Sequence, residues 1–457
     1  MTREAAIAAA AAAFDSGAFE AALARLVALP TESQRQGAEP DLRRYLDEAI
    51  RPMLEPMGFA LRIAENPRGG GPFLIAERRE ETGPVILSYG HGDVVPGMEG
   101  RWRDGRSPWM LDRAGDRLYG RGTADNKGQH LVNLTALDSV LKARGGRPGF
   151  TLRLVIEMGE EAGSLGLHEL FVAEREALAA DVLIASDGPR LAPDRPTLFM
   201  GARGGLSFDL TVDLRAGGRH SGNWGGLIAD PMIRLAHALA AITDARGALR
   251  VPEWRPGSLT PAVRAALAEC PVEGFEEGWG EPGLTPSERV FGWNSFAVLA
   301  VEHGDPAAPV NAIAGRARAR CQLRFVVGTD PKEILPALRR HLAREGFADV
   351  EVSDSADVAF TATRLDPDAP WARWAAASLE RTTGRRPAIL PNLGGSLPNE
   401  EFTDTLGMPT IWVPHSYSGC SQHAPDEHAL RPILREGLAI MAGLWWDLGE
   451  GGTPGRA

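Results

Sequence analysis

The stretch TLRLVIEMGEEAGSLG, residues 151–166, joins an apolar run to two adjacent carboxylates, Glu160 and Glu161. The run at 151–156 is rich in Leu, Val and Ile, which predicts a strand buried on both faces. Two like charges at the end of such a strand repel each other, and neither carboxylate is easily buried alone. Polar residues in this position are typical of a site at the edge of an open α/β sheet.

Other apolar runs resemble this strand and alternate with helix-like stretches. The strand signals are PVILSYG at 84–90, ADVLIAS at 180–186 and PTIWVP at 409–414. Helical periodicity occupies residues 40–54, 128–144, 168–178 and 371–383, and a last helix follows the final strand. Helices between short Val-, Ile- and Leu-rich strands indicate βαβ units. We therefore predict an α/β fold with a mostly parallel sheet covered by helices.

A different pattern begins near residue 200. Strand signals at 205–214, 295–303 and 315–327 alternate apolar and polar residues, as half-exposed antiparallel strands do. The same region contains helix signals at 231–242 and 331–345, a strand signal at 350–355 and an irregular Pro-, Gly- and Trp-rich stretch at 251–293. These segments predict a compact α+β domain inserted at 200–363, which divides the first domain into residues 1–199 and 364–457.

The composition of the 457-residue chain is that of an ordinary soluble globular protein. A formal net charge of −11 without a Lys/Arg cluster argues against nucleic acid or an anionic membrane as a partner. Cys270, Cys321 and Cys420 are far apart, which fits a reducing cytoplasm. No apolar run reaches transmembrane length, and the Ala-rich residues 3–30 favour an amphipathic helix over a signal peptide.

The motif SYGHGDVVPG places His91 and Asp93 just after a predicted strand. Residues two apart in extended chain face the same way, so Asp93 can accept one imidazole N–H while His91 binds a metal through the other nitrogen. Asp125, in YGRGTADNKGQ, lies in a Gly-flanked turn before a helix, and its two oxygens can bridge two cations. Taken alone, the first motif also fits a polar loop, and Asp125 also fits a helix cap.

Three further motifs add carboxylate and imidazole groups. Glu160 and Glu161 fit a general base beside a metal ligand, because a cation neutralises one carboxylate and leaves the other free to take a proton from water. Asp187 follows a strand in VLIASDG, and His423 lies in the polar loop SGCSQHAPDEH. Each motif also has a plain structural interpretation, as an exposed loop, a turn residue or a surface histidine.

Together these residues form a set of ligands for two divalent cations. Imidazole and carboxylate ligands suit zinc, and cobalt or manganese also fit. Two such ions about 3.5–4 Å apart would activate a shared hydroxide. The set comprises five potential ligands, His91, Asp125, Glu161, Asp187 and His423, and one unliganded carboxylate, Glu160.

The chain resembles the M20 family of metallopeptidases in motifs that occur in the family's order over nearly the whole sequence: HGDVVP, GRGTADNKG, GEEAGS, SDG and HAPDE. That family includes carboxypeptidases, dipeptidases, aminoacylases and succinyl-diaminopimelate desuccinylases. The resemblance implies a zinc-exopeptidase-like catalytic domain, residues 1–199 and 364–457, and a lid or dimerisation domain, residues 200–363. It also implies two zinc ions, a small-molecule or short-peptide substrate, and a homodimer formed through the inserted domain.

The resemblance also implies which residue binds which zinc. His91 and Asp187 match the ligands of one zinc, and Asp93 matches the partner that orients His91. Asp125 matches the bridging aspartate, and the peptide bond after it is often cis in the family. These assignments rest on the family's motifs and not on the spacing of the residues.

Glu161 and His423 match the ligands of the other zinc, and Glu160 matches the general base. In the reaction that this implies, the zinc pair lowers the pKa of a bridging water and Glu160 takes its proton. The hydroxide attacks the carbonyl, whose oxyanion is held by zinc and His220. Glu160 then passes the proton to the leaving nitrogen.

The inserted segment carries motifs similar to those with which the family binds substrate. RHSGNWGGLIADP places His220 where it would reach the scissile carbonyl, usually across the dimer. The resemblance also implies a substrate-binding Asn311 and Arg324, and a Gly-rich loop at Gly395 and Ser396 that lies near the substrate carboxylate. An arginine fork suits a carboxylate, which would explain how an acidic protein accepts an anionic substrate. The alternatives are a turn histidine, a solvated strand arginine and a serine that stabilises its turn.

Some positions depart from the family pattern. NAIAG replaces the usual NxIP, and Val327 stands where a proline is expected shortly after Arg324. In PNLGGSLPNEE, Leu393 occupies a position that is acidic in several dipeptidases. Asp187, in place of a glutamate, favours the peptidase and carboxypeptidase branch over the aminoacylase branch. These departures weaken any transfer of substrate specificity from the family.

The leading expectation is a di-zinc dipeptidase or carboxypeptidase that acts on small substrates with a free carboxylate. The alternative is an N-acyl amino acid deacylase, or another amidohydrolase or deaminase, on the same scaffold. A non-catalytic binding relative is a remote alternative, because no ligand or base is lost. Neither GxSxG nor HExxH occurs in the sequence, which argues against a serine hydrolase and a HExxH zinc protease.

Overall fold

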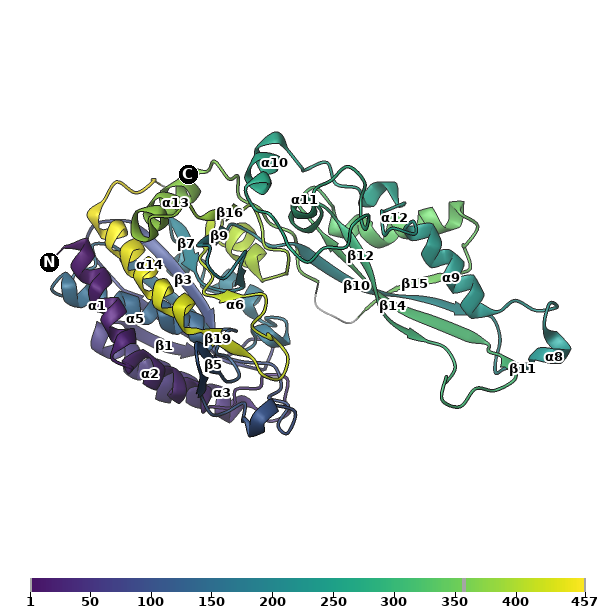
Figure 1. The fold of residues 1–457 in the computed structure, drawn as a ribbon, viewed down its shortest axis with the longest axis horizontal. Helices are drawn as coiled ribbons and strands as arrows, with labels where there is room; N and C mark the ends of the chain where they lie inside the picture. Colours follow the sequence, from purple (N-terminus) through teal and green to yellow (C-terminus); the bar gives the residue numbers. More distant parts are fainter. Residues whose placement is uncertain (1, 356–358, 456–457) are drawn as a thin grey trace. The chain divides into compact units, whose positions relative to one another are not determined.

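The structure is a computed structural model that describes residues 2–355 and 359–455, and the chain divides into two compact units. The first unit comprises Met1–Gly201, Leu365–Pro391 and Pro398–Ala457. The second unit comprises Ala202–Arg364 and Asn392–Leu397. The six-residue segment Asn392–Leu397 therefore groups with the second unit, although the chain on both sides of it belongs to the first. Figure 1 shows the fold and labels many of the helices and strands.

The first unit is built on an eight-stranded sheet in the order β1-β2-β6-β3-β7-β17-β9-β16. Its central strands β6, β3, β7 and β17 run parallel, and antiparallel pairs join them to β2 and β9. The prediction of a mostly parallel sheet is confirmed. The strands are β1 (Ala60–Ala64), β2 (Phe73–Arg78), β3 (Val85–His91), β6 (Thr151–Glu157), β7 (Val182–Ala185), β9 (Thr197–Phe199), β16 (Ala388–Leu390) and β17 (Thr410–Trp412).

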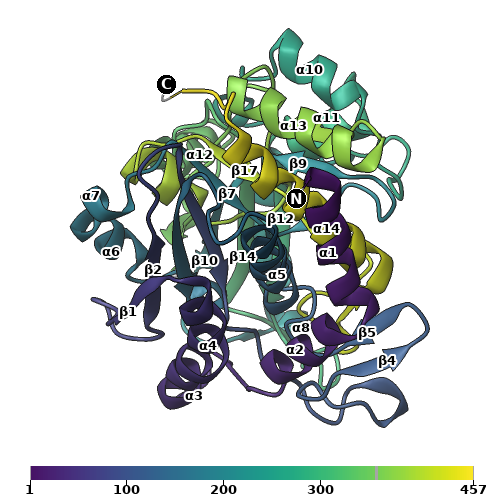
Figure 2. The ribbon, with the colours of Figure 1, turned by 90° about the vertical axis from the view of Figure 1, so that its left-hand side faces the viewer.

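Helices cover both faces of this sheet, because successive side chains of its strands point to opposite faces. On one face, Ile86 of β3 belongs to a core shared with α1, α5 and α14, which lie side by side in Figure 2. On the other face, Tyr89 makes an edge-to-face contact with Phe402, which also packs on Phe171 of α6. The main helices of this unit are α1 (Arg3–Asp15), α2 (Ala18–Val27), α5 (Lys127–Ala143), α6 (Leu167–Ala173), α7 (Arg175–Leu178), α13 (Pro370–Thr383) and α14 (Arg431–Glu450).

The Ala-rich residues 3–30 are largely helical, as predicted, but they form two helices, α1 and α2, separated at Gly17, and not a single one. Ala6, Ala10 and Phe14 recur every four residues along α1 and are buried against the rest of the unit. The predicted helix at 40–54 is also present, as a continuous series of α3 (Glu39–Arg44), the π-helical η1 (Tyr45–Ile50) and α4 (Arg51–Leu54). The remaining elements are the 3-10 turns η2 (Glu55–Met57), η3 (Arg103–Gly105) and η4 (Glu160–Ala162), the π-helical η6 (Glu401–Thr405), and the short strands β4 (Asp112–Ala114), β5 (Arg117–Tyr119), β8 (Pro189–Arg190), β18 (Ser416–Tyr417) and β19 (His428–Leu430).

The second unit is built on a four-stranded antiparallel sheet in the order β12-β14-β10-β15. Alternate residues of β10, such as Phe208 and Leu210, share a core with α9 and α12 on one face. A short ribbon, β11 with β13, pairs His220 with Ala312. The elements are β10 (Gly204–Asp213), β11 (Arg219–His220), α8 (Ser221–Trp224), α9 (Pro231–Ile242), β12 (Ser295–Glu302), β13 (Ala312–Ile313), β14 (Arg316–Phe325), α12 (Pro331–Arg344) and β15 (Glu351–Asp354).

The expectation of an irregular stretch at 251–293 is wrong in part, because it contains η5 (Pro252–Trp254), α10 (Pro261–Ala268) and α11 (Pro286–Phe291). Both α-helices begin with a threonine cap followed by proline, at Thr260 and Thr285. Thr285 and Glu288 form a full capping box. These start signals are short and local, and the surrounding glycines and prolines obscure them.

No single helix among the described residues is long and apolar enough to cross a membrane. The bent pair of α1 and α2 meets the criteria of length and composition only when the two are taken together, with a bend of 60° between them.

Candidate functional site

Three neighbouring parallel strands of the first unit deliver the predicted ligands at their carboxyl ends. His91 is the last residue of β3, Glu160 and Glu161 follow β6, and Asp187 follows β7. Carboxyl ends of adjacent parallel strands meet at one edge of a sheet, so residues far apart in sequence gather there. Asp125 approaches this edge from the loop before α5 and is buried.

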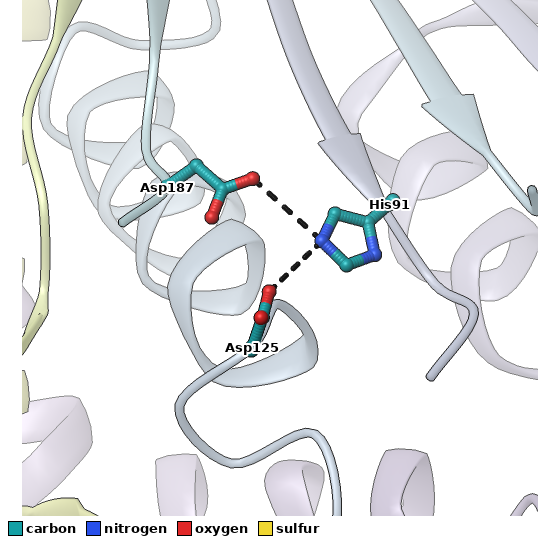
Figure 3. Close-up of side chains that lie close together, drawn as sticks. All are labelled: His91, Asp125 and Asp187. Carbon is teal, nitrogen blue, oxygen red and sulfur yellow. Dashed lines mark hydrogen bonds and ion pairs between the residues drawn. The ribbon is translucent and has the colours of Figure 1, made fainter. Parts of the chain in front are cut away.

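The first group of potential ligands comprises His91, Asp125 and Asp187. His91 Nε2 lies 3.0 Å from Asp125 Oδ1 and 3.6 Å from Asp187 Oδ2 (Figure 3). His91 Nδ1 donates to the backbone carbonyl of Asp93 at 3.1 Å. A carbonyl can only accept, so the proton belongs on Nδ1, and a neutral His91 offers the lone pair of Nε2 to a metal.

The second group comprises Asp125, Glu161 and His423. His423 Nε2 lies 3.0 Å from Asp125 Oδ2 and 3.2 Å from Glu161 Oε2. Within each group the potential ligand atoms all lie within 4.8 Å of one another. Asp125 belongs to both groups and gives one oxygen to each, so it stands where a bridging carboxylate would stand. The peptide bond Asp125–Asn126 is cis, as the resemblance implies.

Asp93 fixes the two adjacent glutamates through their backbone. Its Oδ1 accepts from the N–H of Glu160 at 3.2 Å, and its Oδ2 accepts from the N–H of Glu161 at 3.0 Å. The Asp93 carboxylate therefore accepts its hydrogen bonds mainly from these two amides. Its Oδ1 also lies 3.4 Å from His91 Nδ1. Glu160 belongs to neither ligand group and lies beside both, as a free carboxylate would.

The electrostatics of the cluster show an excess of negative charge. Burial, together with Glu161 and Asp187 nearby, raises the pKa of Glu160 well above its usual range. Burial and the Asp125 charge raise the pKa of Glu161 to about 7 and that of Asp187 to about 6. Hydrogen bonds to Asp125 and Glu161 raise the pKa of His423 to about 11. The carboxylates therefore compete for the little positive charge that the two histidines supply.

The residues present fit a pair of divalent cations. Glu161 Oε1 and Asp187 Oδ2 are buried, and neither has a hydrogen-bond partner in the part of the chain that the structure describes. Buried carboxylate oxygens without donors are costly, and a cation would satisfy them and offset the repulsion. Two imidazoles with three carboxylates are the donor set that zinc, cobalt and manganese accept.

Glu427, which the sequence analysis did not single out, holds the loop of Asp125. Its Oε1 accepts from the backbone N–H groups of Gly122, Ala124 and Asp125 at 3.0, 3.0 and 3.2 Å. Its Oε2 accepts from Arg121 Nη1 at 2.7 Å. Glu427 belongs to the motif HAPDE, which also contains His423, and this position in the motif is the sequence feature that could have identified it.

Two amide side chains of α5 and its cap tie the Asp125 loop to the Asp187 loop. Gln129 Nε2 donates to Ala124 O at 2.9 Å and to Gly188 O at 3.2 Å. Asn126 Nδ2 donates to Ser186 O at 2.9 Å. The residues on both sides of Asp187 are thus held from α5, which fixes the separation of the carboxylates in the first group. Nothing in the local sequence indicated these long-range partners.

The predicted substrate residues all lie in the second unit. His220 lies on the ribbon and is exposed, and Asn311 directly precedes β13, where its carbonyl accepts from Ser221 N at 2.9 Å. Arg324 of β14 reaches the Gly-rich loop and donates to Ser396 Oγ at 2.5 Å, and Gly395 adjoins Ser396. The structure therefore brings these residues together as two groups within this unit.

The family model of peptidase family M20/M25/M40 matches residues 87–447. The chain belongs to this family. Within M20/M25/M40, Beta-Ala-His dipeptidase of Mus musculus is 33% identical over 186 residues, which cover 40% of this chain and 37% of that protein. Cysteinylglycine-S-conjugate dipeptidase of Corynebacterium striatum is 38% identical over 195 residues, 42% of this chain and 41% of that protein. The aligned segments thus span less than half the length of these relatives.

The structure of the di-peptidase Dug1p from Saccharomyces cerevisiae superposes with a TM-score of 0.78 at 21% identity, and the match covers 99% of this chain and 100% of that chain. This likeness shows that the fold is that of the M20 peptidases. The match of the family model over residues 87–447 confirms the predicted membership of the M20 family.

Proposed function

We propose that this chain is a two-metal hydrolase that cleaves the amide bond of a dipeptide, or of a similar small substrate with a free carboxylate. The single observation that carries the proposal is the pair of ligand groups that share Asp125. Membership of a peptidase family supports hydrolysis of a peptide bond. The two curated relatives reported above are named as dipeptidases, which supports a small peptide substrate.

The roles we assign to the ligands follow their grouping. His91 and Asp187 would hold one cation, Glu161 and His423 the other, and Asp125 would hold both. We favour zinc, with cobalt or manganese as alternatives, because the donors are imidazole and carboxylate groups. When bound, the two cations would lower the pKa of a water molecule and polarise the substrate carbonyl.

Glu160 would move the proton. Glu160 is partly buried beside both groups, and Asp93 fixes its backbone. A carboxylate held in this way takes a proton from the attacking water and gives it to the leaving nitrogen, which turns a poor leaving group into a neutral amine. Asp93 serves this step by positioning the 160–161 backbone and His91.

The second unit would bind the substrate. Arg324 has the charge and the geometry to hold a carboxylate, with Ser396 and Gly395 beside it. His220 and Asn311, on the exposed ribbon, would contact the substrate near the scissile carbonyl. We therefore assign residues 1–199 and 364–457 to the catalytic domain and residues 200–363 to the lid and dimerisation domain, with the loop 392–397 added to the latter.

We also propose that the second unit forms a homodimer. β12 is an edge strand, and its side chains Val298, Leu299 and Val301 are exposed. An unpaired apolar edge is a template for strand pairing, which favours a second copy of the same chain. Light scattering of the wild-type protein should give the mass of a dimer, and Leu299→Lys should give that of a monomer.

We place the protein in the cytoplasm, because the three cysteines lie buried at separate positions, as they do in proteins from reducing compartments.

A hydrolysis screen tests the proposed function. Purified chain should hydrolyse members of a dipeptide panel, activity should disappear with a chelator, and zinc should restore it. N-acyl amino acids form the second half of the panel. Hydrolysis of N-acyl amino acids alone would replace the dipeptidase assignment by deacylation, and inactivity on both halves would overturn the proposal.

A further inference from the structure

Strand β14 carries a row of arginines on the sheet face turned away from α9 and α12. Arg318 and Arg320 both pair with Asp209 on the neighbouring strand β10, at 2.6 and 2.7 Å. Ser207, two residues before Asp209, lies opposite Gln322. On this face, Arg318, Arg320 and Gln322 thus each contact a polar side chain of β10.

Arg324 breaks this pattern. The residue opposite it on β10 is Gly205, which has no side chain, and a Cβ there would lie 3.3 Å from both Arg324 Nη1 and Ser396 Oγ. Among the residues that the structure describes, Arg324 pairs with no carboxylate; it donates to Gln322 Oε1 at 2.9 Å and to Ser396 Oγ at 2.5 Å. Gly205 therefore gives the Arg324 guanidinium space, and it offers no side chain that could compensate the charge.

Arg203, just before β10, is a second arginine without a carboxylate partner among the described residues. Its Nε donates to Gly394 O at 2.7 Å and its Nη1 to Ser295 Oγ at 3.1 Å. None of the described carboxylates pairs with it. Burial, followed by the charge of Arg324, lowers the pKa of Arg203 to about 10, so the two guanidinium groups lie close enough to repel each other.

The backbone of Arg203 holds the same loop. Its N–H donates to Leu393 O at 3.2 Å and to Gly395 O at 3.1 Å. Its carbonyl accepts from Ser396 Oγ at 2.7 Å. With the side-chain bond to Gly394, Arg203 contacts each of the four residues at 393–396. No other described residue has this set of bonds to the Gly-rich loop.

The hydrogen bond from Ser396 Oγ to Arg203 O determines whether the hydroxyl can donate to a ligand. A hydroxyl has one proton, and Ser396 gives it to Arg203 O. Ser396 therefore meets Arg324 as an acceptor, and it has no proton left for a substrate carboxylate. It orients the Arg324 guanidinium and does not itself grip an anion.

We propose that Arg203 is a positioning residue for carboxylate recognition: it locks the loop at 393–396 and, through Ser396, aims Arg324 at the carboxylate of the ligand. This inference rests on the proposed function for the identity of the substrate, but the chain Arg203–Ser396–Arg324 is a feature of the second unit alone. The ligand class is a small molecule with a free carboxylate next to the cleaved bond.

The experiment measures binding and turnover with the metal-loaded protein. L-alanine and L-alaninamide, which differ only in the carboxylate, are titrated by calorimetry or saturation-transfer NMR into wild type, Arg203→Gln, Arg203→Lys and Ser396→Ala. Wild type should bind alanine more tightly than the amide. Arg203→Gln should weaken alanine binding about 10- to 100-fold, the loss expected for a misplaced charge-assisted contact, and leave amide binding unchanged. KM for dipeptides should rise in parallel while kcat changes by less than about threefold.

Comparisons between variants show whether Arg203 acts by positioning Arg324, by its charge alone or by stabilising the fold. Arg203→Lys restores the charge without the fork and should recover only part of the binding. The double variant Arg203→Gln/Ser396→Ala should bind alanine no more weakly than the single variant with the lower affinity, because both substitutions act through Arg324. Arg339→Gln is the matched control: Arg339 donates to Val352 O at 2.7 Å in the same unit and touches no residue of the loop.

Several results would overturn the inference. These are a wild type without preference for the carboxylate, full recovery by Arg203→Lys, additive losses in the double variant, or an equal loss in Arg339→Gln. If wild type hydrolyses no dipeptide but its preference for alanine depends on Arg203, the proposed function fails and the inference stands.

Discussion

The two units each contain a region of uncompensated charge, and the signs are opposite. In the first unit, carboxylates gather around two histidines, and burial with mutual repulsion raises the pKa of Glu160, Glu161 and Asp187. In the second unit, Arg203 and Arg324 lie close together without a carboxylate partner among the described residues. A chain that leaves buried charge unbalanced loses stability unless a ligand supplies the opposite charge.

At other positions the same chain compensates buried charge with ion pairs. Asp447, which is buried, accepts from Arg3 Nε at 2.8 Å, Ser378 Oγ at 2.6 Å and Arg381 Nη2 at 2.6 Å, and this joins the first and last helices of the first unit. Asp209 does the same for Arg318 and Arg320. The contrast supports our proposals that the first region binds cations and that the second binds a carboxylate.

The largest effect is expected from the ligand that both groups share. Asp125→Asn should lower hydrolysis below about one thousandth of wild type and reduce the metal content, because metal activation supplies several kcal/mol of the barrier reduction. Asp138→Asn is the control, since Asp138 lies on α5 and pairs with Lys142 at the surface. Full metal content and activity in Asp125→Asn would remove the basis for a shared ligand.

Glu160→Gln tests the carboxylate that belongs to neither ligand group. Because the substitution removes the proton acceptor and keeps the shape, kcat should fall about 10²- to 10⁴-fold. Elemental analysis of the same sample should find the wild-type metal content. Retained turnover would show that Glu160 is not the base, and loss of metal would make it a ligand.

Gln129→Leu tests how far the cation site depends on its supports. The variant keeps the volume but loses the bonds to Ala124 O and Gly188 O, so the Asp125 and Asp187 loops should separate. Metal affinity, measured by competition with a chelator, should fall about 10- to 100-fold. Gln322→Leu, in the second unit, is the matched control and should leave metal affinity unchanged.

The smallest effect is expected at Asp209, whose negative charge is already compensated by arginines of the same chain. Asp209→Asn would remove the carboxylate that pairs with Arg318 and Arg320 and should cost about 1 kcal/mol of the free energy of unfolding, a modest value because both arginines are partly exposed.

The cost of Asp209→Asn should depend on pH in a definite direction. Burial opposes ionisation of Asp209, but the bonds from Arg318 and Arg320 outweigh it and lower the pKa. The stabilisation is therefore present above the unfolded pKa of about 3.9 and is lost as the pH falls through the lower folded value. Urea unfolding from pH 7 downward should show the variant converging on wild type, and a gap that widens in acid would contradict this assignment.

The sequence predicted the elements and the ligand positions because these depend on local patterns. Apolar runs that end in polar residues marked β3, β6 and β7, and with them His91, Glu161 and Asp187. Helix α9 begins and ends at the predicted residues, Pro231 and Ile242, because a capped start and an apolar stripe define it. The pairing of the candidate ligands into two groups followed from the family resemblance. The same residues lie together in two groups in the structure, and their binding of metal stays a prediction.

The supports of the site could not be predicted, because they depend on contacts between distant parts of the chain. Glu427 bonds to the Asp125 loop across about 300 residues, and Gln129 reaches Gly188. The loop at 392–397 follows the first unit in sequence but groups with the second through Arg203. Its glycines predicted a turn, but no local pattern indicates the partner of that turn.

The metal stoichiometry of the wild-type chain tests the central claim most directly. The chain is stripped with a chelator, reloaded with zinc, dialysed and analysed for metal against protein concentration. The account predicts two tightly bound divalent ions per chain, with activity rising as they bind. One ion or none at saturation, with activity unaffected by stripping, would contradict it.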